Sequence, residues 1–106
     1  MAAAVGGRVG GRTQVKNVEG NREVQELGRY CVQEYNRQQQ QNRLLVFSRV
    51  VEAQTQIVSG IKYYLNISAR AGGEPQSFEA VAVVKPWLHS KQLLNFGPSS
   101  SPRNTK

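Results

Sequence analysis

The sequence predicts an α+β fold, in which one helix is followed by an antiparallel meander that packs one face on that helix. Three observations lead to this prediction: one segment has the apolar spacing of a helix, the later segments alternate as strands do, and the links between them are short. The chain has 106 residues, which suffices for one small domain and leaves no room for a second core. We therefore interpret residues 1–106 as a single domain.

The helix is expected from about Arg22 to Arg37. Asn21 is suited to cap its N-terminus. A glycine inside a helix is about 1 kcal/mol less favourable than an alanine. The presence of Gly28 on the apolar side therefore indicates a close approach between the helix and the element on which it packs. The apolar residues of the helix are spaced by three, four and four positions and form one stripe: Val24, Leu27, Cys31 and Tyr35.

Three strand-like segments follow, at Leu44–Thr55, Ile61–Ala69 and Phe78–Lys85, and Leu93–Phe96 is expected as a short edge strand. The alternation of the first segment breaks near Arg49, which predicts a bulge. The connections are Gln56–Gly60, the Gly72-Gly73-Glu74-Pro75 turn region and Lys85–Lys91. Apolar alternate positions predict the face against the helix: Ile61, Tyr63, Leu65, Ile67, Phe78, Ala80, Ala82 and Val84. The other alternate positions predict a wetter face: Lys62, Asn66, Ser68, Glu79 and Lys85.

The two ends of the chain lack a sustained hydrophobic period. Residues 1–20 are interpreted as a flexible leader rich in glycine and charge, of which 1–11 are taken as the flexible N-terminal leader of the domain, and 97–106 as a flexible polar tail. Met1–Arg12 has no apolar core of a secretory signal, so a cytoplasmic location is expected, or a secreted or vacuolar one if a signal segment was removed. The single cysteine, Cys31, excludes an internal disulfide.

The net charge is +7, from 14 basic and 7 acidic residues. The basic residues are scattered, without a run of three, so they are expected to form a solvated surface. The alternative is a module that binds nucleic acid or an anionic surface, with an affinity that falls steeply with salt. We expect neither nucleic acid nor membrane as a partner, and no apolar stretch approaches the roughly 20 residues of a membrane-spanning helix.

The sequence contains no set of residues that could together catalyse a reaction. Cys31 lies on the predicted buried stripe, whereas a nucleophilic cysteine needs an exposed thiolate within reach of a base. His89, the one histidine, has no neighbouring cysteine or acidic cluster, so no metal is expected. No glycine motif leads from a strand into a helix to hold phosphate. We expect no enzyme activity and no cofactor.

Three other features are more informative together than alone. Gln56-Ile57-Val58-Ser59-Gly60 places β-branched residues in a tight connection, which is typical of a binding edge or of an ordinary hairpin whose strands extend further. Pro86-Trp87 places an indole after a strand-ending proline, either as an interface anchor or as a core side chain. Val9-Gly10-Gly11 permits close backbone approach to a partner, or is simply a flexible tail. A meander brings the links after the first and third strands to one end, which the leader can also reach, so the three features could line one apolar edge.

At these positions the sequence resembles the plant cystatins. Leu27-Gly28-Arg29-Tyr30-Cys31-Val32-Gln33-Glu34-Tyr35-Asn36 is similar to the helix signature of that family, although Gly28, Tyr30 and Cys31 replace the usual Ala, Phe and Ala. Residues 56–60 match the Gln-X-Val-X-Gly loop, Pro86-Trp87 matches the second loop, and Gly10-Gly11 resemble the N-terminal glycine pair. The resemblance covers about Val9 to Phe96 and implies a cystatin-like antiparallel sheet of four to five strands wrapped around one helix.

The resemblance also implies a function. A plant cystatin would be a reversible, competitive, tight-binding inhibitor of papain-like cysteine proteases, with a role in plant defence. The protease-binding residues would be these: Val9, Gly10, Gly11, Gln56, Ile57, Val58, Ser59, Gly60, Pro86 and Trp87. A homodimer formed by domain swapping at the first loop is a second expectation. The family extension that inhibits legumain-type proteases is not seen, and use of the same fold for storage or taste is the alternative within the family.

Overall fold

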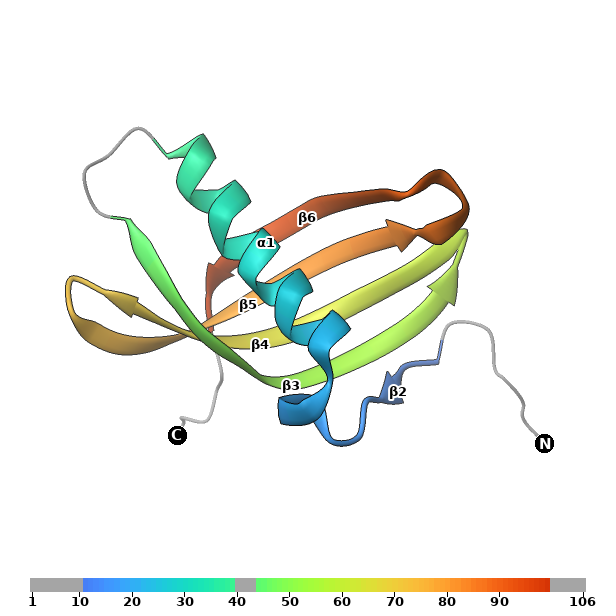
Figure 1. Cartoon of the computed structure of the whole chain (residues 1–106), viewed down its shortest axis with the longest axis horizontal. Coiled ribbons are helices and arrows are strands. Elements are labelled where there is room, and N and C mark those ends of the chain that lie inside the picture. The colour runs from blue at the N-terminus through green and yellow to red at the C-terminus, as the bar shows by residue number, and fades with distance from the viewer. Residues whose placement is uncertain (1–10, 40–43, 100–106) are drawn as a thin grey trace.

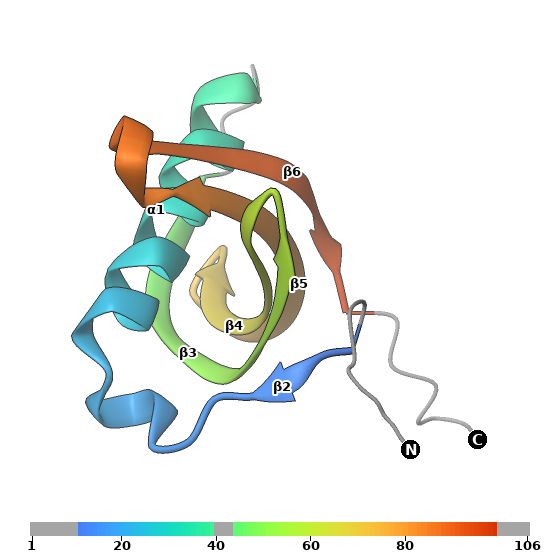
Figure 2. The same cartoon turned by 90° about the vertical axis from the view of Figure 1, so that its right-hand side faces the viewer.

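The protein is described by a computed structural model that covers residues 11–39 and 44–99. The elements are strand β2 (Thr13–Gln14), short helix η1 (Val18–Gly20), helix α1 (Arg22–Gln38), strands β3 (Leu45–Val58), β4 (Gly60–Ala71) and β5 (Glu74–Lys85), short helix η2 (Pro86–Leu88) and strand β6 (Ser90–Pro98). The sheet order is β2-β3-β4-β5-β6, and every neighbouring pair is antiparallel. Helix α1 lies across one face of the sheet (Figure 1), and the sheet curves around that helix (Figure 2). The predicted α+β meander is confirmed.

Helix α1 begins and ends close to the predicted positions. The Oδ1 atom of Asn21 accepts a hydrogen bond from the backbone N–H of Val24 at 3.1 Å, which confirms the predicted cap. The helix runs one residue beyond the expected Arg37. Its stripe is buried as expected, except that Tyr35 is half-buried and stacks on Phe96 with ring centroids 4.5 Å apart.

Two helix side chains fix α1 to β3 by hydrogen bonds to backbone groups. Asn36 donates to Leu45 O at 2.9 Å and accepts from Leu45 N at 3.0 Å. Gln25 accepts from Val50 N at 2.9 Å and donates to Val50 O at 3.1 Å. Val50 lies between two breaks in the β3–β4 register, one at the predicted bulge near Arg49 and one before Glu52. Gln25 therefore satisfies backbone groups where the strand ladder is interrupted.

The core lies between α1 and the concave face of the sheet. Small residues on β3, β4 and β5 let the helix approach closely, and the larger ones fill the space between. All of the predicted apolar alternate positions are buried or half-buried. The buried apolar residues are Val18, Val24, Leu27, Cys31, Val32, Leu45, Val50, Ala53, Leu65, Ile67, Ala69, Phe78, Ala80 and Ala82.

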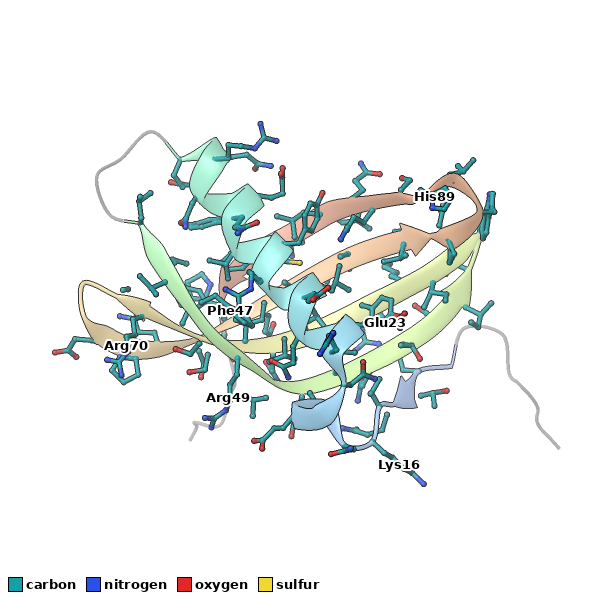
Figure 3. The ribbon with its side chains drawn as sticks, in the orientation of Figure 1. Lys16, Glu23, Phe47, Arg49, Arg70 and His89 are labelled. Carbon is teal, nitrogen blue, oxygen red and sulfur yellow. The ribbon has the colours of Figure 1, made fainter. Side chains whose placement is uncertain are left out.

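Gly28 is the position of closest contact between α1 and β3. A Cβ atom added there would overlap Cγ2 of Val50 and lie 3.0 Å from Cε1 of Phe47. Phe47 lies between β3 and the middle of the helix (Figure 3). The close approach predicted from this glycine is confirmed, and it explains why a poor helix former occupies the centre of α1.

We expect Gly28→Ala to lower the free energy of unfolding by about 1–2 kcal/mol, although alanine favours the helix. The gain of about 1 kcal/mol in propensity is smaller than the cost of overpacking against a fully buried valine. Chemical denaturation of Gly28→Ala, Val50→Ala and the double variant measures this. The double variant should lose less stability than the two single losses combined, because Val50→Ala makes room for the new methyl group. Strictly additive losses would contradict this explanation.

The structure corrects several predicted boundaries. Residues 13–20 are not part of an unstructured leader, because Thr13–Gln14 pairs with β3 and Val18 is buried. Strand β6 extends the expected edge strand in both directions, so Gly97 and Pro98 belong to the sheet rather than to the flexible tail predicted at 97–106. Pairing of these residues with Glu79 and Phe78 explains the difference, since periodicity does not reveal an edge strand that alternates weakly. Within the described residues, no helix is long and apolar enough to span a bilayer.

Candidate functional site

The first loop is the turn between β3 and β4. Val58 pairs with Gly60 and Ile57 with Ile61, so Ser59 alone lies between the paired residues at the tip. The predicted connection Gln56–Gly60 is therefore mostly strand, as the ordinary-hairpin alternative describes. The side chains nevertheless remain exposed, by 68% for Ile57 and 45% for Val58. This combination presents apolar groups on a backbone that is held by the sheet.

Gly60 holds the first loop against β5. Its φ of +124° is strained for any residue with a side chain. A Cβ atom there would lie 2.9 Å from Val84 O and 3.0 Å from Cγ of Lys85. The first loop is thus seated directly on the end of β5, from which the second loop begins.

The second loop is formed by η2 and His89, which connect β5 to β6. Pro86 begins the short helix, and His89, at φ +50°, donates its backbone N–H to Pro86 O at 3.0 Å. Trp87 is 62% exposed and Leu88 59% exposed. The structure therefore does not support the alternative in which Trp87 is a core side chain. Leu88 was not among the predicted site residues, although its position directly after Pro86-Trp87 could have indicated it.

The two loops lie at the same end of the sheet. Ile61 pairs with Val84, and Lys85 pairs with Ser90, so the β3–β4 turn is adjacent to the β5–β6 connection. Figure 1 shows both at one end, and in Figure 3 His89 and Arg70 lie at opposite ends of the molecule. This agrees with the shared end expected from the meander. We call the exposed side chains of Ile57, Val58, Trp87 and Leu88 the apolar edge.

The leader approaches the same end along the outer side of β3. Thr13 pairs with Thr55 and Gln14 with Gln54, so each step toward the N-terminus advances one residue toward Val58. Gly11 is exposed and, by this register, lies at the level of Ile57. Val9 and Gly10, the other predicted leader residues, lie outside the described residues.

The described residues offer no catalytic arrangement. Cys31 is completely buried, and burial raises the pKa of its thiol to about 12, so the nucleophilic thiolate does not form near neutral pH. His89 is exposed on the second loop. In the described ranges 11–39 and 44–99, no three His, Cys, Asp or Glu side chains come together as metal ligands would.

The buried thiol predicts a loss of stability at alkaline pH. An unfolded cysteine titrates near pH 8.5, whereas the folded thiol keeps its proton to about pH 12. The unfolded state thus binds fewer protons above pH 9, and the free energy of unfolding falls as pH rises. Burial also raises the pKa values of Tyr30 and Tyr63, which adds to the fall above pH 10. The free energy of unfolding, measured by urea denaturation between pH 8 and 11, should fall less steeply with pH in Cys31→Ala than in the natural chain. Equal slopes for the two proteins would show that the Cys31 thiol does not contribute to the fall.

Comparison with known proteins places this arrangement in a family. A family model described as aspartic acid proteinase inhibitor matches residues 15–99. Cysteine proteinase inhibitor 4 of Oryza sativa subsp. japonica is 53% identical over 110 residues, and the match covers 93% of this chain and 70% of that protein. Cysteine proteinase inhibitor 5 of the same plant is 56% identical over 98 residues, covering 90% of this chain and 66% of that protein. The chain belongs to the plant cystatin family.

The fold of this cystatin is similar to that of an animal cystatin. Dimeric human cystatin F superimposes with a TM-score of 0.67 at 20% identity, covering 83% of this chain and 85% of that one. The cystatin-like α+β fold predicted from the sequence is thereby confirmed. The plant relatives are named cysteine proteinase inhibitors, so the family to which the chain belongs is one of inhibitors and not of enzymes.

Proposed function

We propose that this cystatin is a reversible, competitive, tight-binding inhibitor of papain-like cysteine proteases. The observation that carries the proposal is the apolar edge, in which two loops present four large apolar side chains at one end of a rigid sheet. Isolated apolar residues are common on surfaces, but a clustered group on two adjoining loops is typical of an interaction site. The Oryza sativa relatives named cysteine proteinase inhibitors support the class of target.

In this proposal the edge and the leader fill the active-site cleft of the protease. Val58 and Gly60 cover the region of the catalytic cysteine, and Trp87 packs on the primed-side wall next to Pro86. Val9 is directed toward the nonprimed S2 subsite, with Gly10 and Gly11 allowing the leader to pass close to the enzyme. Gln56, Ile57 and Ser59 complete the first loop.

The same geometry accounts for inhibition without cleavage. The peptide groups on both sides of Ser59 belong to paired strands, and Gly60 is held against Val84 O. A substrate peptide must instead present its scissile bond in a near-attack geometry. The paired loop blocks the cleft without offering such a bond. Its rigidity also reduces the ordering cost of binding, which favours high affinity.

The direct test is a titration of papain with this cystatin while hydrolysis of a small substrate is followed. We expect inhibition that raises the apparent KM, that reverses on dilution, and that leaves the cystatin intact by mass spectrometry. Pepsin is the comparison enzyme, because the matching family model is described as aspartic acid proteinase inhibitor. Pepsin should retain its activity, while inhibition of pepsin without inhibition of papain would overturn the proposal.

A second proposal concerns assembly. Ser59 is the tip of a one-residue link, and opening it would join β3 and β4 into one continuous strand that could pair in a second molecule. Human cystatin F, whose structure is described as dimeric, shows only that a protein of similar fold can form a dimer. Gel filtration before and after mild heating should show a dimer that has lost papain inhibition, because the first loop no longer exists in it. A monomer at every concentration and after heating would contradict the proposal.

The biological setting follows from the proposed target. We propose a role in plant defence and a cytoplasmic location, or a secreted or vacuolar location if a signal segment was removed. Cell fractionation with an antibody against the cystatin tests the location. Recovery exclusively in the vacuolar or extracellular fraction would contradict the cytoplasmic assignment.

A further inference from the structure

Arg12 immediately precedes strand β2, and its side chain contacts strands β3 and β4. Its guanidinium carbon lies 3.5 Å from the centroid of the Tyr64 ring, which places the planar group directly on the ring face. Its Nη1 atom donates to Oε1 of Gln54 at 3.3 Å. One side chain of the leader thus contacts both strands that form the first loop.

Tyr64 extends this contact to the first loop itself. Its hydroxyl donates to Oε1 of Gln56 at 2.6 Å, and Gln56 is the first residue of the five-residue loop motif. A continuous series of contacts therefore runs from Arg12 through Tyr64 to Gln56. Lys62 provides a comparison on the same ring, with its Nζ atom 5.4 Å from the ring centroid, but Lys62 belongs to β4 and not to the leader.

The backbone pairing of the leader is short. Strand β2 has two residues, and Val15 N donates to Ala53 O at 2.9 Å beyond them. Arg12 and Gly11 come immediately before this strand, at the positions where the leader must be directed toward the end of the sheet that carries the loops. A glycine does not fix its own direction, because it has access to more backbone conformations than any other residue.

We propose that Arg12 is the positioning residue of the leader. Its stacking on Tyr64 fixes Arg12 against the strands of the first loop before the protease binds, and so sets the point from which the chain continues toward Val9. This inference rests on the proposed function, in which Val9 contacts the protease. Arg12 acts through the leader and makes no contact with the enzyme in this account.

The energetic reason is preorganisation. A leader that is oriented in the free inhibitor pays less ordering cost on binding. The planar guanidinium suits this task better than an ammonium group, because it stacks on an aromatic face and donates a hydrogen bond in a fixed direction. The contact is exposed, so its effect on affinity is expected to be moderate, about 3- to 10-fold.

The test is a double-mutant cycle between Arg12→Ala and Val9→Ala in the full chain, with inhibition of papain as the readout. Arg12→Ala should weaken inhibition about 3- to 10-fold when Val9 is present, and less than about 2-fold in the Val9→Ala background. An equal loss in both backgrounds would overturn the proposal, because Arg12 would then act independently of the leader. Full inhibition by Arg12→Ala would overturn it as well.

Matched variants separate the stacking from charge and from folding. Arg12→Lys keeps the charge and should recover only part of the affinity, while Tyr64→Phe keeps the ring and should preserve the coupling between Arg12 and Val9. Lys62→Ala removes a cation from the same ring, and any loss it causes should be the same in both Val9 backgrounds. A Lys62→Ala effect that depends on Val9 as strongly as that of Arg12→Ala would contradict the assignment.

A measurement on the free inhibitor distinguishes this inference from the proposed function. Amide hydrogen exchange at Thr13 should be faster in Arg12→Ala than in the natural chain, and unchanged in Lys62→Ala. If the natural chain fails to inhibit papain, the proposed function is wrong, and this exchange experiment still decides whether Arg12 orders the leader. Unchanged exchange at Thr13 would disprove that ordering.

Discussion

Replacing Trp87 with alanine is expected to raise the inhibition constant for papain by about 30-fold or more. The indole is rigid, large and 62% exposed in the free inhibitor, so most of its apolar surface is available for burial by the enzyme. Truncation of such an anchor at the centre of an interface typically costs about 2 kcal/mol or more. The expected consequence is faster dissociation of the complex, measured by dilution of preformed complex into substrate.

Two controls separate this effect from a change in folding or in general surface hydrophobicity. Because Trp87 is largely exposed, the free energy of unfolding should change by less than about 0.5 kcal/mol. Leu94→Ala removes another large apolar side chain, 48% exposed on β6 and outside the apolar edge. It should alter the inhibition constant by less than about 2-fold. Equal losses from Trp87→Ala and Leu94→Ala would show that the second loop has no special role.

Gly60→Ala should reduce both stability and inhibition. The backbone conformation at φ +124° is costly for alanine, and the new methyl group would press against Val84 O, which belongs to the backbone and cannot rotate away. We expect a loss of about 2–3 kcal/mol in the free energy of unfolding. For a domain of this size this lowers the midpoint of thermal unfolding by roughly 10–20 °C. Any relaxation of the clash moves the first loop away from the second, so the protein that remains folded should inhibit papain at least about 10-fold less well.

Gly73→Ala is the matched control for this prediction. Gly73 also has a positive φ, +88°, but no atom lies within 4 Å of an added Cβ, and it belongs to the turn at the opposite end of the sheet. It should lose about 1 kcal/mol from backbone strain and retain full inhibition. If both variants lost the same stability and the same inhibition, the contact between Gly60 and β5 would be irrelevant.

The helix and the inner strands were predictable because each obeys a local rule that the core reinforces. Asn21 caps α1, and the stripe from Val24 to Cys31 faces the sheet. The second half of strand β4 alternates in burial as it does in sequence, with Leu65 and Ile67 inside. Gly28 was informative for the opposite reason, since a residue that disfavours a helix needs a packing explanation.

The ends of the elements were not predictable, because they depend on partners that are distant in sequence. Ser90 joins β6 only because Lys85 lies opposite it, and Pro98 because Phe78 does. Thr13–Gln14 is too short for any periodicity, and its strand exists because the edge of β3 is available to it.

The candidate site, like the fold, was predictable from the sequence only in part. The motifs at Gln56–Gly60 and Pro86-Trp87 indicated which residues to consider, and the meander indicated that they meet. The exposure of Ile57 and Leu88, and the contact of Gly60 with Val84 O, required the three-dimensional arrangement. The stacking of Arg12 on Tyr64 has no sequence signal, since the two residues are 52 positions apart and neither belongs to a motif.

The central claim is that the two loops at one end of the sheet are the surface that the protease covers. Amide hydrogen exchange of this cystatin, free and in complex with papain, tests that claim most directly. We predict slower exchange in the complex at residues 57–60 and 87–89, with no change at the Gly72–Gly73 turn. Slower exchange confined to the Gly72–Gly73 end, with the two loops unaffected, would contradict the claim.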